Sequence, residues 1–392
     1  MRVFFLSPWF PYPPNNGSKL RIYHLLRGLA QDHEITLISF SKQPDVDQNE
    51  PITRSLCEEI IVVPRKDYQP NSARAVVGLF SLSPRSIIDT YSPEMAQKIV
   101  EATSIKAFNV VIASELGAAS YRRFFKGLPA IFEDVEIGVI HGNFTDANSL
   151  RERIRHGLTW QKHMRYLSRL VKSYEACTVV SKQDKALLTE IVRGLNSVEV
   201  IPNCINLPDY INVPRERQKQ TLIFTGPFRY RANYEAMLWF MGEAYPIVQS
   251  QIPDVQMLIT GDHADLLLPE TKGVTLTGMV PDVRPLIASA TVSIAPILTG
   301  GGSRLKILEA MALHTPVVAT SKGAEGLNVQ HDVHILIADT SEAFAQQVIR
   351  LLKEPDLRKR LVSNAYKLVQ NQYNWAVVMP KFLDLVERVA RS

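Results

Sequence analysis

The chain has 392 residues, of which 46% are hydrophobic and 21% charged, a composition typical of a soluble globular protein rather than of a disordered or fibrous one. The length exceeds what one ordinary core holds and predicts two domains. The net charge of +5 is small, and we expect no nucleic-acid partner.

The opening of the chain predicts alternating strands and helices. The runs "RVFFLS" (2–7) and "EITLISF" (34–40) are typical of buried parallel strands, and "SKLRIYHLLRGLAQ" between them has helical spacing. Strand-like runs recur at 60–63, 109–114, 129–132 and 177–181, and Ser181 with Asp184 resembles a helix cap. This alternation predicts a doubly wound sheet.

Residues 198–220 interrupt the alternation with three prolines, three asparagines and a polar run, and we interpret them as a linker. A second series of strand-like runs follows at 221–226, 255–261, 274–278, 291–296, 316–320 and 333–338. We therefore predict an N-terminal domain over 1–210, a C-terminal domain over 211–375, and a final helix over 376–392 that could cross back to the first domain.

Basic residues gather in one predicted helix. Residues 151–172 hold seven Lys or Arg and one Glu, a local charge of +6, so the rest of the chain is close to neutral. Within 160–174 the apolar and basic side chains fall on opposite helix faces: Trp160, Met164, Leu167, Val171 and Tyr174 against Lys162, Arg165, Arg169 and Lys172. The pattern fits a solvated outer face or, alternatively, an anionic membrane surface reached by 151–174.

Targeting and redox signals are few. No apolar run approaches 18 residues, and the first one, "VFFLS", is too short for a signal peptide, so we expect a cytoplasmic protein. Cys57, Cys177 and Cys204 form no CxxC pair, which predicts three reduced thiols. Neither the histidines nor the aspartates show metal-ligand spacing, so no metal or cofactor is expected.

The run "TGGGSRLK" (299–306) is the most distinctive local signal. Glycines allow close approach to a phosphate, and a helix start supplies free N–H donors. If Ser303 is the cap, Arg304 and Lys306 occupy the first and third helical positions, where cations are unfavourable unless an anion compensates. The run therefore predicts a diphosphate site, with Glu309 one turn further on as a ribose acceptor or, alternatively, as an exposed ion-pair partner of Lys306.

The segment "PILTGGGSRLKILEAMALHTPVVAT" resembles the donor site of family 4 glycosyltransferases, which are retaining enzymes of the GT-B fold. The resemblance covers most of 221–375 and implies two Rossmann-like, doubly wound α/β domains facing a central cleft. In the first half it is confined to the Gly17 loop, "YEACTVVSKQD" and "VIPNCINL".

Carried over by position, the resemblance implies a ribose role for Glu309 and diphosphate roles for Lys306 and Arg304. It adds donor-binding positions at Gly17, Gly226, Arg229, Arg231, Met279, Val280, Gly302, Ser303 and Leu305. Two departures stand out. Gly301 occupies the place of the family's first motif glutamate, and acids at Glu133, Asp134 and Glu136 stand where relatives often have a histidine. Glu136 could assist the acceptor hydroxyl or position the sugar, or these acids could only cap a loop.

The resemblance implies a retaining, metal-independent glycosyltransferase that moves a sugar from a nucleotide-diphosphate donor to a hydroxyl acceptor, in bacterial polysaccharide or glycolipid assembly. A lipid-linked or acidic glycan acceptor would place the enzyme peripherally on the inner membrane face. The alternatives are a nucleotide-sugar epimerase of the same fold and a non-catalytic sugar-nucleotide binding protein. The sequence leaves open the donor base and sugar, the acceptor, the linkage and the oligomeric state.

Overall fold

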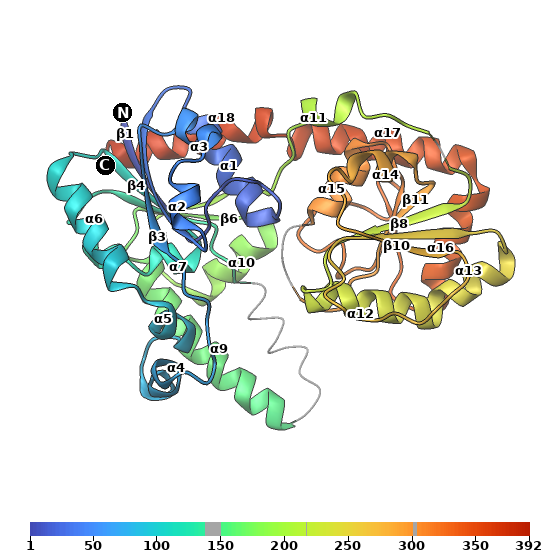
Figure 1. Ribbon diagram of the computed structural model, residues 1–392, viewed down its shortest axis with the longest axis horizontal. Coiled ribbons are helices and arrows are strands. Elements are labelled where there is room, and N and C mark those ends of the chain that lie inside the picture. The colour runs from blue at the N-terminus through green and yellow to red at the C-terminus, as the bar shows by residue number, and fades with distance from the viewer. Residues whose placement is uncertain (138–149, 217, 301–303) are drawn as a thin grey trace. The chain divides into compact units, whose positions relative to one another are not determined.

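The computed structural model describes residues 1–137, 150–216, 218–300 and 304–392, with the backbone alone for 150–156 (Figure 1). These residues form two compact units, one of 1–202 with 379–392 and one of 203–378. The division after Pro202 lies slightly before the predicted boundary at 210.

The first unit is built on a seven-stranded parallel sheet with the order β3-β2-β1-β4-β5-β6-β7. The strands are β1 (Arg2–Ser7), β2 (Glu34–Ser41), β3 (Glu59–Pro64), β4 (Val110–Ser114), β5 (Ala130–Glu133), β6 (Ala176–Val179) and β7 (Val198–Val200). Strand β7 corrects the sequence analysis, which assigned 198–200 to a linker. The run is only three residues long and lies at the sheet edge, so no long apolar run marks it.

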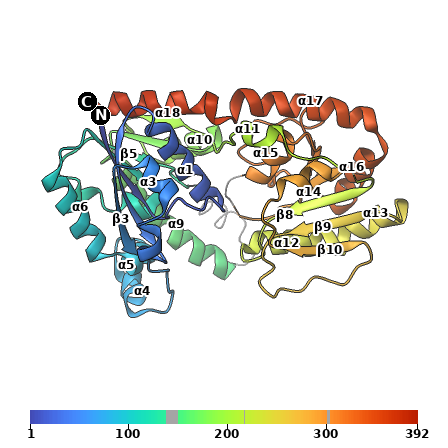
Figure 2. The same cartoon turned by 45° about the horizontal axis from the view of Figure 1, so that its top comes forward.

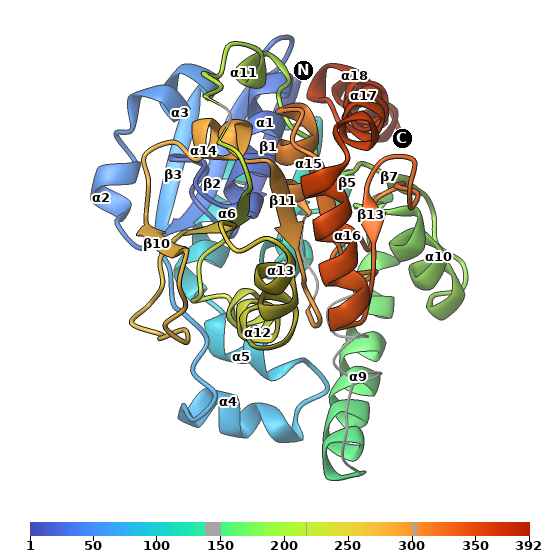
Figure 3. The same ribbon diagram turned by 90° about the vertical axis from the view of Figure 1, so that its right-hand side faces the viewer.

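Helices surround this sheet. They are α1 (Gly17–Leu29), α2 (Pro44–Asp47), α3 (Pro51–Leu56), α4 (Ala73–Val77), η1 (Gly78–Phe80), α5 (Arg85–Thr90), α6 (Pro93–Ile105), α7 (Glu115–Ala119), η2 (Arg122–Phe124), α9 (Leu150–Val171) and α10 (Lys182–Ile191). Ser181 caps α10 by accepting from the Asp184 amide at 3.0 Å, which confirms the predicted cap. Figure 3 shows α4 and α5 extending from the unit on the same side as the N-terminal end of α9.

The amphipathic pattern of α9 is confirmed. Met164, Leu167, Val171 and Tyr174 are buried in one core with strand residues of β1, β4 and β5, and Trp160 packs against that core. Arg165, Arg169 and Lys172 are exposed. The apolar stripe therefore docks the helix, and its basic stripe faces outward.

The second unit repeats the design with a six-stranded parallel sheet of order β10-β9-β8-β11-β12-β13. The strands are β8 (Thr221–Thr225), β9 (Gln256–Thr260), β10 (Val274–Gly278), β11 (Val292–Ala295), β12 (Val317–Ala319) and β13 (Leu336–Ile337). Each falls within a predicted strand, because short apolar runs between turn residues are a strong local signal.

Two helical layers cover this sheet, with α12 on one side and α14 and α15 on the other (Figure 2). The first layer comprises α12 (Arg231–Trp239), η3 (Phe240–Ala244), α13 (Tyr245–Gln251) and α16 (Ser341–Lys353). The second comprises α11 (Pro208–Ile211), α14 (Arg284–Ser289), α15 (Leu305–Ala312) and α17 (Pro355–Gln372). Helix α18 (Trp375–Ala390) follows, and from Met379 onward it belongs to the first unit.

Both sheets share a strand order in which the direction of winding reverses next to the first strand of the unit. In the first unit this happens between β1 and β4, and in the second between β8 and β11. In open α/β sheets, ligands bind beyond the carboxyl ends of the strands at such a switch point. The residues that follow these four strands are therefore the first candidates for function.

Candidate functional site

In the second unit, the switch point joins Gly226, which follows β8, to the segment after β11 that leads into α15. Lys306 on the first turn of α15 lies at this junction. Its Nζ donates to Asn233 Oδ1 at 2.8 Å and lies 4.1 Å from the centre of the Phe224 ring. The contacts thus gather residues from β8, α12 and α15 around one ammonium group.

The environment of Lys306 disfavours its charged form in the absence of an anion. Burial, and then neighbouring Arg304, lower the pKa of Lys306 to about 7, while Glu309 opposes both effects. A bound diphosphate would supply the missing negative charge and raise the pKa again. A perturbed cation at a switch point is a physical indication of an anion site.

Gly226 is required by the close packing at the same point. Its φ of +150° lies outside what side-chain-bearing residues readily adopt. A Cβ there would lie 2.6 Å from Asn233 Nδ2 and 3.1 Å from Lys306 Nζ. The glycine therefore brings the backbone after β8 next to the Lys306 ammonium, as a phosphate-binding turn needs.

Glu309 lies one turn after Lys306 on α15 and is held by a partner that the sequence analysis missed. The Tyr210 hydroxyl donates to Glu309 Oε1 at 3.1 Å, and burial raises the pKa of Glu309 to about 6. Tyr210 stands in the stretch predicted as a linker, where no local signal indicates a contact to a residue 99 positions later. The carboxylate is thus oriented before any ligand arrives.

We expect Glu309→Gln to weaken the binding of ribonucleotides by about 1–2 kcal/mol, because the amide accepts fewer hydrogen bonds than the carboxylate. The 2′-deoxy form should lose less, since one of its hydroxyls is already absent. Calorimetric titration of both ligands measures the difference, with Glu342→Gln, an exposed carboxylate on α16, as the control. Equal losses for the two ligands would remove Glu309 from the ribose.

The start of α15 differs from the prediction. The helix begins at Leu305, and Arg304 takes the N-cap position that we predicted for Ser303. The Arg304 guanidinium is buried and forms a salt bridge with Glu325 at 3.3 Å, so its charge is already partly neutralised. Gly302 and Ser303 lie outside the described residues.

The other predicted donor residues lie on more open surface. Arg229 pairs with Asp262, and Arg231 pairs with Glu235 at 2.6 Å. Met279 is 73% exposed, and Val280 is half-buried. No described contact joins either arginine to Lys306, and the roles of all four residues stay predictions.

In the first unit, the switch point brings Glu115 to the loop after β1. Glu115 follows β4 directly and adopts a φ of +59°, a left-handed conformation that costs energy for a residue with a side chain. Its carboxylate accepts from Trp9 Nε1 at 3.2 Å. Burial, and then Glu136, raise the pKa of Glu115 to about 7, with a hydrogen bond from Ser18 opposing the rise. The sequence analysis missed this residue, although its position directly after a strand was the available signal.

The acids after β5 are organised by Arg21 on α1. Arg21 Nε lies 2.6 Å from Glu133 Oε1 and 3.8 Å from Asp134 Oδ2. Burial raises the pKa of Asp134 well above its usual range, and Asp134 Oδ1 has no hydrogen-bond partner among the described residues. Glu133 thus forms the closer ion pair with Arg21, and burial disfavours the charged form of Asp134.

Glu136, the acid predicted to assist the acceptor, belongs to the same group. Loss of hydration raises its pKa, and Asp184 and Glu133 add to the rise. Gly17 begins α1, one residue before the predicted helical run that starts at Ser18, and the cap is Asn16, whose side chain accepts from the Lys19 amide at 3.0 Å. The Ser18 side chain forms a hydrogen bond with the Glu115 carboxyl group.

Within the described ranges, no group of three His, Cys, Asp or Glu is arranged to hold a metal ion. The three cysteines are buried and form no disulfide. No helix in the part of the chain that the structure describes is long and apolar enough to cross a bilayer.

Comparisons with known proteins agree with this architecture. Residues 219–354 match the family model of glycosyl transferases group 1. A Klebsiella pneumoniae protein named "uncharacterized 44.6 kDa protein in cps region" is 23% identical over 95% of this chain and 96% of its own. The phosphatidyl-myo-inositol mannosyltransferase of Mycobacterium leprae is 32% identical over 51% of this chain and 55% of that enzyme, so the match spans about half its length.

Solved structures share the fold over the whole chain. Sucrose-phosphate synthase from Thermosynechococcus elongatus superposes with a TM-score of 0.71 at 17% identity, covering 100% of both chains. HepE of Anabaena, in complex with UDP-glucose, has a TM-score of 0.66 at 12% identity, covering 99% of this chain and 100% of its own. Together with the two sheets described above, these matches show that the chain has the GT-B fold, and that its residues 219–354 match glycosyl transferases group 1.

Proposed function

We propose that the chain is a retaining, metal-independent glycosyltransferase that moves a sugar from a nucleotide-diphosphate sugar to a hydroxyl acceptor. The observation that carries this proposal is the Lys306 ammonium, held by Asn233 beside the glycine turn at Gly226. With Glu309 one turn along, the spacing suits a diphosphate followed by a ribose.

In the proposed reaction, the bond between the anomeric carbon and the diphosphate breaks while the acceptor oxygen bonds to the same face of that carbon. The acceptor proton passes to the departing phosphate oxygen, so the chain needs no strong base of its own. Lys306, Arg304 and the N–H groups at the start of α15 stabilise the negative charge that develops on the diphosphate. Because the chain supplies these positive groups itself, we propose no metal in the step.

We propose that the acceptor binds in the first unit, where a pocket of about 260 Å³ lies beside Glu115. Trp9, Arg65, Thr90 and Tyr91 are among the residues that line it, a mixture of aromatic and polar side chains that suits a sugar. The raised pKa of Glu115 lets this carboxyl donate or accept a hydrogen bond near neutral pH.

We also propose that the enzyme acts in the cytoplasm, peripherally on the inner membrane face, in bacterial polysaccharide or glycolipid assembly. The outward cations of α9 support this, because each Lys or Arg near an anionic bilayer contributes about 1 kcal/mol. A lipid-linked or acidic glycan acceptor would fit that location.

A thermal-shift panel of nucleoside diphosphates tests the donor assignment. One nucleoside diphosphate should raise the free energy of unfolding by about 2.7 kcal/mol when present at 100 times its dissociation constant. This increase should persist in EDTA. Stabilisation that requires a divalent cation would contradict the metal-independent proposal. If no nucleotide stabilises the protein, the donor site itself is wrong.

A further inference from the structure

Residues 76–82, which we call the apolar knob, present large apolar side chains to solvent at the tip of the first unit. Phe80 is 91% exposed, and Val77, Leu79 and Leu82 are 66%, 55% and 70% exposed. Scattered single apolar residues are ordinary on a protein surface, but four so exposed within six positions are a patch that calls for a partner.

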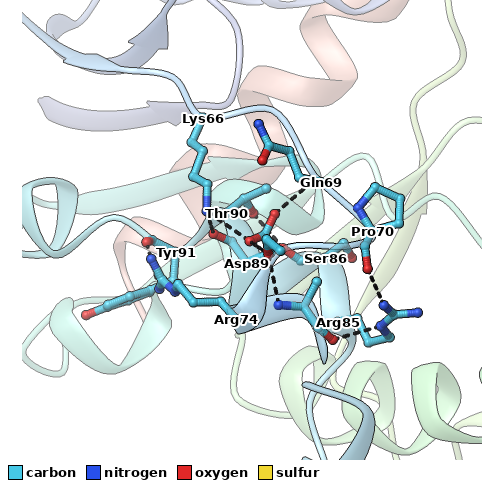
Figure 4. A network of polar contacts seen from close by, with 11 residues as sticks. Lys66, Gln69, Pro70, Arg74, Arg85, Ser86, Asp89, Thr90 and Tyr91 are labelled. Atoms are coloured by element: carbon cyan, nitrogen blue, oxygen red, sulfur yellow. Dashed lines mark hydrogen bonds and ion pairs between the residues drawn. The ribbon is translucent and has the colours of Figure 1, made fainter. Parts of the chain in front are cut away.

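The knob is a built feature and not a loose loop. At its base, buried Asp89 accepts from Lys66 Nζ and the Gln69 amide at 2.8 Å each, and from the Ser72 hydroxyl (Figure 4). These bonds hold the pKa of Asp89 well below its usual range. The network fixes both ends of the segment that contains α4, η1 and α5.

A second set of contacts joins the helices on either side of the knob. Arg85 Nε donates to the Ala75 carbonyl at 2.8 Å, which joins α5 to α4 (Figure 4). At Gly78, a Cβ would lie 3.2 Å from Arg85 Cα, so the turn between these helices is closely packed. The Asp89 network and the Arg85 contact thus hold the segment at its base, and its large apolar side chains are left exposed.

The basic face of α9 adjoins the knob. Lys162 Nζ donates to the Gly78 carbonyl at 2.5 Å, so one cation of that face holds the knob directly. The exposed Arg165, Arg169 and Lys172 take part in none of the salt bridges found among the described residues. Residues 70–88 and 157–172 together carry six Lys or Arg and no Asp or Glu.

We propose that the apolar knob inserts among the acyl chains of an anionic bilayer, while the cations of α9 lie at its headgroups. This inference rests on the proposed peripheral location and names the element that achieves it. A surface with apolar side chains at its tip and only positive charge around them complements such a bilayer. A patch of four side chains is also far smaller than the 20–30 residues that a stable protein interface takes from each partner.

Insertion is tested with the variant F80W and vesicles of phosphatidylglycerol and phosphatidylcholine. Relative to the wild-type protein, its added tryptophan fluorescence should shift to the blue and be quenched by brominated acyl chains. The change should be much smaller with vesicles of phosphatidylcholine alone. If F80W binds the vesicles but its added tryptophan fluorescence is neither shifted nor quenched, the knob does not insert and the proposal is overturned.

Co-sedimentation with the same vesicles tests the two parts separately. L79S/F80S should reduce binding by about tenfold or more, since it removes two exposed apolar side chains. The matched control is I105S, which removes an 87% exposed side chain at the end of α6. R165Q/R169Q should reduce binding about fivefold per cation and weaken its salt dependence, whereas K359Q, at an exposed lysine of the second unit, should do neither.

Two further outcomes would overturn the proposal. If L79S/F80S binds the vesicles as strongly as the wild type, α9 alone is the membrane contact. Self-association without vesicles that L79S/F80S abolishes would make the knob a contact with a second copy. Nucleotide affinity should be unchanged in all these variants, so a failure of the membrane proposal leaves the proposed transfer reaction standing. Absence of nucleotide binding by the wild-type protein would count against that reaction instead.

Discussion

Lys306→Ala is expected to weaken the binding of a nucleotide-diphosphate sugar by about 1.5–3 kcal/mol, the range for hydrogen bonds to charged groups, or roughly 10- to 150-fold. The ammonium is already positioned by Asn233 and packs against the Phe224 ring, so little side-chain entropy is lost when the ligand binds. Calorimetric titration measures the loss, and a bare nucleoside, which lacks the diphosphate, should be nearly unaffected. Equal losses for the two ligands would contradict the assignment.

The pH dependence of the same affinity gives an independent check. Because the pKa of Lys306 is about 7 without ligand, raising the pH above 7 removes the charge that the diphosphate needs, and affinity should fall. A nucleotide-diphosphate sugar suits this test, because its two phosphates do not titrate in that range. Lys306→Ala should abolish the fall, whereas Lys353→Ala, at an exposed lysine of α16, should retain it.

Arg21→Met is expected to lower the free energy of unfolding by about 3–5 kcal/mol, because it leaves the Glu133 carboxylate buried without its cation. Both side chains of the pair are almost fully buried, at 2% and 0% exposure. Denaturant unfolding measures the loss. Arg2→Met is the matched control, since its ion pair with Glu34 lies on the surface and should contribute less than about 1 kcal/mol.

A second substitution separates the charge from the packing. Arg21→Met combined with Glu133→Gln also removes the Glu133 charge and should recover part of the loss, because the amide can still accept from the Ser114 hydroxyl. If Arg21→Met alone costs no more than the surface control, the ion pair does not stabilise the first switch point as described.

The sheets were largely predictable, because most of the parallel strands are buried on both faces and are therefore apolar runs between turns. Strand β7 escaped prediction since its residues are only half-buried at the sheet edge. The spacing of Lys306 and Glu309 was also readable, as one turn of a helix sets it. Local periodicity contains that much information.

Non-local partners were not predictable by the same means. Asn233 and Lys306 lie 73 positions apart, and Arg21 and Glu133 lie 112 apart, so only the folded units bring them together. The helix that holds Arg21 looks merely amphipathic in the sequence. The exposed apolar residues 76–82 were likewise hidden, because an apolar run in a sequence says nothing about which side chains the core leaves uncovered.

The most direct test of the central claim is proton NMR of the products when the protein is incubated with a panel of nucleotide-diphosphate sugars, with water as the slow acceptor. The account predicts that one donor releases its nucleoside diphosphate and that the sugar first appears in the donor's own anomeric configuration, with or without EDTA. A first product of inverted configuration would contradict retention. An epimerised sugar would indicate the epimerase alternative, and donors that all stay intact while binding would indicate a non-catalytic sugar-nucleotide binding protein.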